Sequence, residues 1–107
     1  MNNENENPNE VSSQTQNGRI LAYLQKGETI TSLEALDLFQ CFRLASRMTD
    51  LKNLNVPFDS VRITTPTGKH VKAYFIPEAF AKRHGLELDG DLATYASIHA
   101  TDKISAR

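Results

Sequence analysis

Apolar residues in the central part of the chain recur with the period of an α-helix, in two successive segments. In residues 32–39 they lie three apart, which predicts a short amphipathic helix. Thr31 and Glu34 have the spacing of a capping box, so this helix is expected to begin at residue 32, with Glu34 on its solvent side. The expected buried face consists of Leu33, Leu36 and Phe39, with Ala35 and Leu38 beside them.

A change of apolar phase near Gln40 and Cys41 indicates a tight turn, followed by a second helix over about 42–53. The core positions of that second helix lie within a narrow arc and are Leu44, Met48 and Leu51. A short helix, a turn and a second helix have the layout of a helix-turn-helix, whose second helix can enter the major groove of DNA.

The opposite face of the second helix is polar and carries Arg43, Ser46, Arg47, Thr49, Asp50 and Asn53. These residue types reach phosphates or base edges when a helix lies in a groove. Exposed helix faces of proteins that never touch DNA have the same composition, so this pattern alone leaves both interpretations open. Asp50 would repel phosphate, and we expect it to pair with Arg43 or Arg47 or to accept a hydrogen bond from a cytosine amino group.

Two strand-like runs follow, residues 58–64 and 70–76, and the segment 65–69 between them has the composition of a turn. Asn55 is expected to end the preceding helix in a left-handed conformation, with Pro57 blocking its continuation. A hairpin placed directly after a helix-turn-helix is the outline of a winged helix, in which the hairpin runs along the DNA backbone.

Further elements are predicted on both sides of this region. Residues 14–26 form a leading helix that stops at Gly27, and Ile30 is expected to pair with the hairpin. Pro77 opens a short helix that ends at Gly85. In the remainder Leu92, Tyr95 and Ile98 lie three apart, and three alternatives stay open for it: packing on the domain, pairing with a second copy, or disorder.

The pattern from the leading helix to the hairpin is carried by Ile20, Leu21, Tyr23, Leu24, Gly27, Ile30, Thr31, Glu34, Ala35, Leu36, Arg43, Leu44, Ala45, Arg47, Met48, Asp50, Leu51, Lys52, Val56 and Pro57. In this pattern residues 18–76 resemble the small winged helix-turn-helix domains found in many bacteriophage and prophage proteins. The resemblance implies an α+β fold: a winged helix-turn-helix with a three-helix core, a β-hairpin wing and a short C-terminal helix. Such domains usually carry glycine near Gln40 and at Asn55, and this chain has neither glycine.

Charge is distributed unevenly along the chain, although the net charge is −1. Residues 1–13 contain three glutamates and no basic residue, whereas residues 39–76 carry six basic residues against two aspartates, a balance of +4. The basic excess thus falls on the predicted second helix and wing, which favours double-stranded DNA as a partner. A monomer of this size would bind DNA weakly, so a homodimer or a host protein partner stays open.

The length of 107 residues predicts one domain, with residues 1–13 as a disordered lead, 14–85 as the winged helix-turn-helix and 86–107 as an extension that is weakly helical or disordered. No apolar run has the length of about 20 residues that a membrane-spanning helix needs, so no membrane association is expected. The single cysteine, Cys41, excludes an internal disulfide and fits a cytoplasmic protein, in the bacterial host cell if the chain is phage-encoded.

Enzyme chemistry is not expected, because the three histidines are scattered and no metal-binding or phosphate-cradling motif is present. We therefore expect no catalytic residue, metal or cofactor, and predict a DNA-binding transcriptional regulator or accessory factor of DNA transactions. The predicted contacts are Arg43, Ser46, Arg47 and Asn53 in or beside the major groove, and Lys69, His70 and Lys72 of the wing on the backbone. The alternative is a protein-binding module that modulates a host nucleic-acid-binding complex, with Phe42 as an anchor.

Overall fold

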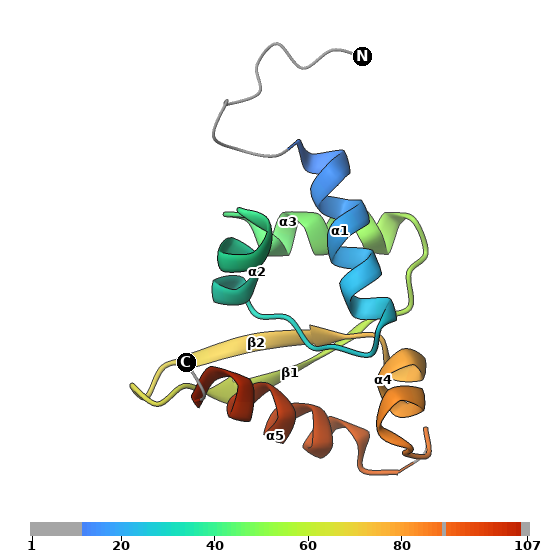
Figure 1. Ribbon diagram of the computed structural model, residues 1–107, viewed down its shortest axis with the longest axis vertical. Helices are drawn as coiled ribbons and strands as arrows, with labels where there is room; N and C mark the ends of the chain where they lie inside the picture. Colours follow the sequence, from blue (N-terminus) through green and yellow to red (C-terminus); the bar gives the residue numbers. More distant parts are fainter. Residues whose placement is uncertain (1–11, 89, 106–107) are drawn as a thin grey trace.

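A computed structural model describes residues 12–88 and 90–105 of the chain. The elements are α1 (Ser13–Gln25), α2 (Ser32–Phe39), α3 (Leu44–Asn53), β1 (Asp59–Thr64), β2 (His70–Phe75), α4 (Pro77–His84) and α5 (Leu92–Ser105). Helices α1 to α3 gather on one side of the antiparallel β1–β2 hairpin, and α5 crosses its other side (Figure 1). The predicted α+β fold is confirmed.

The capping box of α2 is present as predicted, but the helix turns a different face to the core. The backbone N–H of Glu34 donates to Thr31 Oγ1 (3.3 Å), and that of Thr31 donates to Glu34 Oε1 (3.0 Å). Glu34 and Ala35 are buried, whereas Leu33 and Leu36 are exposed. The expectation that the leucines form the buried face of α2 is therefore wrong, because the Glu34 side chain turns inward to close the cap.

The turn between α2 and α3 passes through Gln40, which takes the left-handed conformation at φ 50°. The buried Gln16 side chain of α1 donates from Nε2 to the carbonyl oxygen of Gln40 (3.0 Å). The N–H of Cys41 donates to the carbonyl of Ala35 (3.1 Å). Asn55, at φ 66°, ends α3 in the same conformation, as predicted. Both positions where related domains usually carry glycine thus adopt the backbone that glycine favours.

The hairpin has two unlike faces because side chains alternate along each strand. On one face Ile63 and Ala73 are buried together with Ala100 of α5. On the other face Tyr74 packs against the helical core, next to Phe58 in an edge-on contact. The backbone of Ile30 pairs with Tyr74 in both directions, which confirms the predicted link between the first loop and the wing.

Helix α4 begins with Pro77 and ends at Gly85, which has φ 68°, as predicted. It packs tightly on the loop after α1. A Cβ atom at Gly27 would lie 2.5 Å from the Cβ of Arg83 and 2.8 Å from the carbonyl oxygen of Ala79. Gly27 also has φ 89°, so both the backbone angle and the close approach of α4 require glycine at this position.

Helix α5 packs against β1 through small residues. Leu92, Ala96 and Ala100, four residues apart, are buried, whereas Tyr95 and Ile98 are exposed. The three-residue spacing that placed Tyr95 and Ile98 on one stripe with Leu92 therefore identified the wrong face. Small alanines lie closest to the sheet because they allow the helix backbone to approach it.

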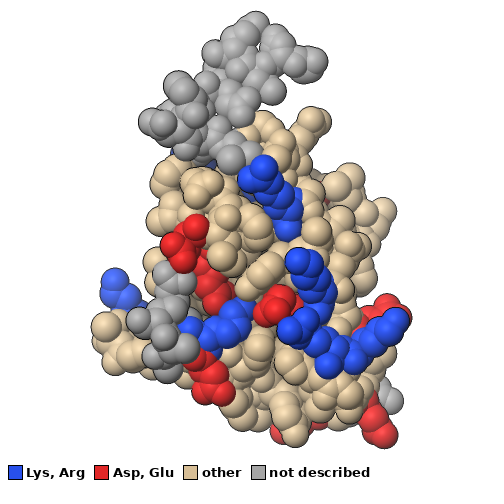
Figure 2. Space-filling model, in the orientation of Figure 1, with Lys and Arg blue, Asp and Glu red and all other residues tan. Residues whose placement is uncertain are grey.

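Lys103 of α5 ties this helix to the loop between α1 and α2. Its Nζ donates to the carbonyl oxygen of Thr29, and it lies 3.6 Å from Glu28 Oε1 and 3.4 Å from Glu34 Oε2. Arg83 of α4 approaches Glu28 as well (3.5 Å). On the face seen in Figure 2, Lys and Arg side chains alternate with Asp and Glu side chains, so this face is mixed in charge.

His99 lies in the same cluster, and its Nε2 is 3.6 Å from Glu28 Oε1. Burial lowers the pKa of His99 below its usual 6.5, and the Lys103 ammonium and the neighbouring His84 lower it further, while Glu28 opposes both. At pH values between the lowered pKa and 6.5, His99 is protonated in the unfolded chain but not in the native protein. The free energy of unfolding therefore falls as the pH falls below about 6.5.

We predict that His99→Gln makes the free energy of unfolding less dependent on pH below about 6.5, because glutamine does not titrate. Urea unfolding of wild type and variant at several pH values measures this. The control Gln14→Ala, at an exposed position of α1 with no titratable side chain, should keep the wild-type dependence. Equal slopes for His99→Gln and wild type would contradict the expectation.

We predict that Gln16→Ala lowers the free energy of unfolding by about 1–2 kcal/mol, because the carbonyl of Gln40 loses its donor. Thermal unfolding should shift down by roughly 4–8 °C per kcal/mol. Gln16→Glu keeps the shape but removes the donor, so it should lose at least as much stability. Gln14→Ala, at an exposed position of α1, is the control and should stay within about 0.5 kcal/mol of wild type. A Gln16→Glu protein as stable as wild type would show that the amide donor is unimportant.

Candidate nucleic-acid interface

Arg43 occupies the N-cap position of α3, because the helix begins at Leu44 and not near residue 42 as predicted. Among the described residues no side chain forms a capping hydrogen bond at this end, and Arg43 is exposed. The backbone N–H groups of the first helical turn have no partner within the helix and carry partial positive charge. An uncapped helix start beside an exposed guanidinium can accept a phosphate group.

The other polar residues of α3 differ in their access to solvent. Ser46 lies near the start of the helix and is half-buried. Thr49 is exposed, but its hydroxyl donates back to the carbonyl of Ala45 (3.0 Å). Asn53 is the last residue of the helix and is exposed, about 13 Å along the axis from Leu44 at 1.5 Å per residue. Arg43 and Ser46 thus lie at one end of α3 and Asn53 at the other.

Arg47 is held in place by its neighbours. Its Nε donates to Asp50 Oδ2 at 3.0 Å, and the side-chain amide of Asn17 on α1 donates to the same oxygen at 3.2 Å. The Arg47 side chain is 18% exposed. The ion pair expected for Asp50 is therefore confirmed with Arg47, and Asn17 links its carboxylate to α1.

The wing carries Lys69, His70 and Lys72, which are all exposed. Its turn is closed by hydrogen bonds from Thr65 N–H to the carbonyl of Lys69 (2.7 Å) and from Lys69 N–H to Thr65 Oγ1 (3.1 Å). Gly68, at φ 89°, supplies the left-handed residue of this turn. The Thr64 hydroxyl and His70 Nδ1 lie 3.2 Å apart across the strands. These contacts fix the backbone from which the basic side chains project.

Arg62 is a further basic residue of this surface, and the sequence did not single it out as a contact. It lies directly opposite Lys72 in the strand register, so both side chains project from the same face of the hairpin. Like charges at such positions repel one another. Alternation along β1 was the available signal, since Arg62 occupies the polar phase between Val61 and Ile63.

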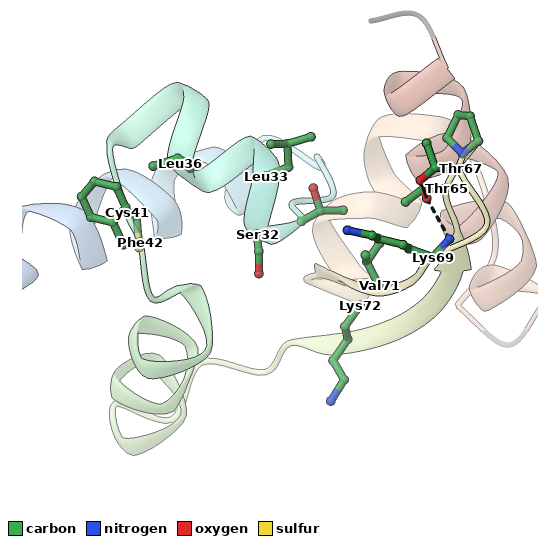
Figure 3. Close-up of a pocket in the computed structure, with 12 residues that line it drawn as sticks. Ser32, Leu33, Leu36, Cys41, Phe42, Thr65, Thr67, Lys69, Val71 and Lys72 are labelled. Carbon is green, nitrogen blue, oxygen red and sulfur yellow. Dashed lines mark hydrogen bonds between the residues drawn. The ribbon is translucent and has the colours of Figure 1, made fainter.

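Helix α2 with the turn that follows it and the wing lie across a groove from one another (Figure 3). Phe42, next to Arg43, lines this groove together with Lys69 and Lys72, and no carboxylate is among the residues that line it. Within residues 12–88 and 90–105, none of the exposed cations Arg43, Arg62, Lys69 and Lys72 forms an ion pair. We call these four residues and His70 the α3–wing surface. Its charge is not compensated by the described part of the protein.

Neither a metal-ligand cluster nor a membrane-spanning helix is found in the described residues. No group of three His, Cys, Asp or Glu side chains there could hold a metal ion. Cys41 is a buried thiol at the turn. None of the helices there combines the length and the apolar character that crossing a bilayer requires.

Comparison with known proteins gives one family. A model of the winged helix-turn-helix domain matches residues 15–79, from α1 to the start of α4. The resemblance inferred from the sequence pattern is thereby confirmed, and α5 lies outside the matched region. Neither the curated proteins nor the solved structures contain a match to the chain.

We predict that Asp50→Asn strengthens binding to random-sequence duplex DNA about threefold to tenfold at low salt, because it removes a charge that repels phosphate and releases Arg47. Asp102→Asn, at an exposed position of α5, changes the net charge equally and should have a smaller effect. Fluorescence anisotropy with a labelled duplex measures both variants. Weaker binding by Asp50→Asn would mean that the carboxylate itself contacts DNA.

Proposed function

The chain belongs to the winged helix-turn-helix domain family, and from this premise we propose that it binds double-stranded DNA through the α3–wing surface. Domains of this family are typically DNA-binding modules without catalytic activity. In the proposed complex the start of α3, with Arg43 and Ser46, enters the major groove. Lys69, His70 and Lys72 of the wing hold the backbone, and Asn53 borders the groove at the far end of α3.

The observation that carries the proposal is the uncompensated charge of the α3–wing surface. Several charges elsewhere are paired: Glu28 lies within 3.6 Å of both His99 and Lys103, and Arg47 is paired with Asp50. Arg62 and Lys72 instead face the same side of the hairpin without a carboxylate partner in the described part of the chain. A phosphate backbone would supply the missing negative charge and relieve their repulsion.

The number of cations on the α3–wing surface limits the affinity with which one copy of the protein would bind DNA. Four cations can neutralise about four phosphates, and each contributes about 0.9 to the slope of log affinity against log salt. Nonspecific dissociation constants of this class lie at about 10⁻⁴–10⁻⁶ M at physiological salt. Useful specificity then requires two copies on adjacent half-sites or a partner protein. We therefore propose a homodimer or a hetero-complex on DNA as the active form.

Within this framework we propose a transcriptional regulator or an accessory factor of DNA transactions that acts in the cytoplasm. The resemblance of residues 18–76 to domains of bacteriophage and prophage proteins supports an origin of that type. A regulator needs only to occupy a site, and an accessory factor only to bend or mark it, so neither role demands a catalytic centre.

We predict that Arg43→Ala/Lys72→Ala lowers the salt slope of binding to random duplex DNA by about 1.8, from two lost phosphate contacts. Anisotropy titrations between about 50 and about 200 mM salt give the slope. Lys26→Ala/Lys82→Ala removes two exposed cations outside the surface and serves as the matched control, with an unchanged slope. Thermal unfolding should be unaltered in both variants, since all four side chains are exposed.

Two outcomes would contradict the proposal. Absence of binding by the wild-type protein at about 50 mM salt would exclude DNA, because nonspecific affinity is greatest at low salt. An equal loss of slope in the control variant would mean that binding follows net charge and does not use the α3–wing surface.

A further inference from the structure

Large apolar side chains of α2 lie on the surface of the protein, where they form one wall of the groove beneath the wing. Leu33 is 54% exposed and Leu36 is 39% exposed, and Phe42, just after the turn, is 63% exposed. All three line the groove, with Val71 of β2 and the buried Cys41 beside them. The groove has a volume of about 700 Å³, within the range of about 300–1,000 Å³ typical of ligand-binding clefts.

The α3–wing surface and the groove have different chemistry, although they are adjacent. Protein–DNA interfaces are more polar and more positively charged than interfaces between proteins. Leucine and phenylalanine side chains offer a phosphate neither a positive charge nor a hydrogen-bond donor. Exposed apolar side chains that gather in a groove mark contacts with apolar partner groups instead. The wall formed by Leu33, Leu36 and Phe42 therefore points to a protein partner.

The opposite wall of the groove supplies positive charge. Lys69 extends from the wing toward the start of α2, near Ser32, and Lys72 projects from the neighbouring strand (Figure 3). Hydroxyl groups of Thr65 and Thr67 complete this side, and Ser32 lines the groove on the α2 side. Since no aspartate or glutamate lines the groove, its charge is purely positive. A partner must therefore combine apolar side chains with carboxylates.

A second copy of this chain fits the groove less well. Within the described residues, the acidic segment after α4 includes Glu87 and Asp91 and exposes one large apolar side chain, Leu88. Leu86 and Leu92 of that segment pack into the interior instead. One leucine cannot cover the wall that Leu33, Leu36 and Phe42 present.

We propose that the groove between α2 and the wing binds an acidic amphipathic segment of a partner protein. Its apolar side chains, three and four residues apart, contact Leu33, Leu36 and Phe42, and its carboxylates pair with Lys69 and Lys72. The pairing gives orientation and specificity, and the apolar wall gives most of the affinity. Because Lys69 and Lys72 also belong to the α3–wing surface, the bound segment and DNA exclude one another, a consequence that rests on the proposed function.

Binding of a designed peptide to the intact protein tests the site directly. The probe is a fluorescein-labelled helix of about two heptads with the repeat Glu-Leu-Glu-Glu-Leu-Leu-Glu. One comparison peptide has lysine at every glutamate position, and another has alanine at every leucine position. We expect the acidic amphipathic peptide to bind at least about tenfold more tightly than either comparison peptide, which corresponds to about 1.4 kcal/mol.

Variants of the two walls separate their contributions. Leu33→Ser/Leu36→Ser should weaken the acidic peptide about tenfold or more, and Lys69→Glu/Lys72→Glu should transfer the preference to the lysine peptide. All four residues are exposed, so the fold is expected to persist, and circular dichroism verifies it. Leu54→Ser, at a 66% exposed position outside the groove, is the matched control and should bind like wild type.

Three results would overturn the proposal. Wild-type affinity in Leu33→Ser/Leu36→Ser would exclude the apolar wall, and equal binding of the acidic and lysine peptides would exclude charge recognition. Self-association of the wild-type protein that Leu33→Ser/Leu36→Ser abolishes, measured by sedimentation, would make the groove an interface between copies. These measurements use no DNA, so they stand if the proposed DNA binding fails. Displacement of labelled duplex DNA by the acidic peptide tests mutual exclusion separately.

Discussion

The path of the chain from α2 to α3 depends on a hydrogen bond between the buried Gln16 side chain and the carbonyl oxygen of Gln40 (3.0 Å). A residue other than glycine in the left-handed conformation lowers the stability of the fold by about 1–2 kcal/mol. Gln40 adopts this conformation although it is not glycine. The bond from α1 offsets part of this cost. It also fixes where α3 begins, which places Arg43 at the N-cap position of α3, directly after Phe42 of the groove.

A second set of contacts stabilises the hairpin on the face that packs against α5. An isolated two-stranded hairpin is at best marginally stable in water, and α5 covers one of its faces with Ala100 against Ile63 and Ala73. Lys103 then joins α5 to the loop after α1 through Thr29 and Glu28. Because these contacts occupy the face opposite the basic side chains, the wing is supported without covering the α3–wing surface. The family match ends at residue 79, so α5 lies outside the matched region.

Local signals in the sequence predicted most boundaries, including the capping box, the left-handed Asn55, the start of α4 at Pro77 and the pairing of Ile30. The buried faces of α2 and α5 were harder to predict. Periodicity identifies residues that share one face of a helix, but it does not show which face packs against the rest of the protein. In α2 the cap draws Glu34 inward toward Lys103 and leaves Leu33 outside. Alternation along β1 could have indicated that Arg62 is exposed, but its position opposite Lys72 and the groove could not be found from spacing, since they depend on strand register and on contacts between distant segments.

The central claim is that one surface, formed by the start of α3 and the wing, meets DNA. A titration of the isotopically labelled protein with short random-sequence duplex, followed by amide chemical shifts in NMR spectra at low salt, tests it most directly. We expect shifts at Arg43, Ser46 and residues 65–72, with α4 and α5 unchanged. Shifts concentrated on α4 and α5, or no shifts at protein concentrations well above about 10⁻⁴ M, would contradict it.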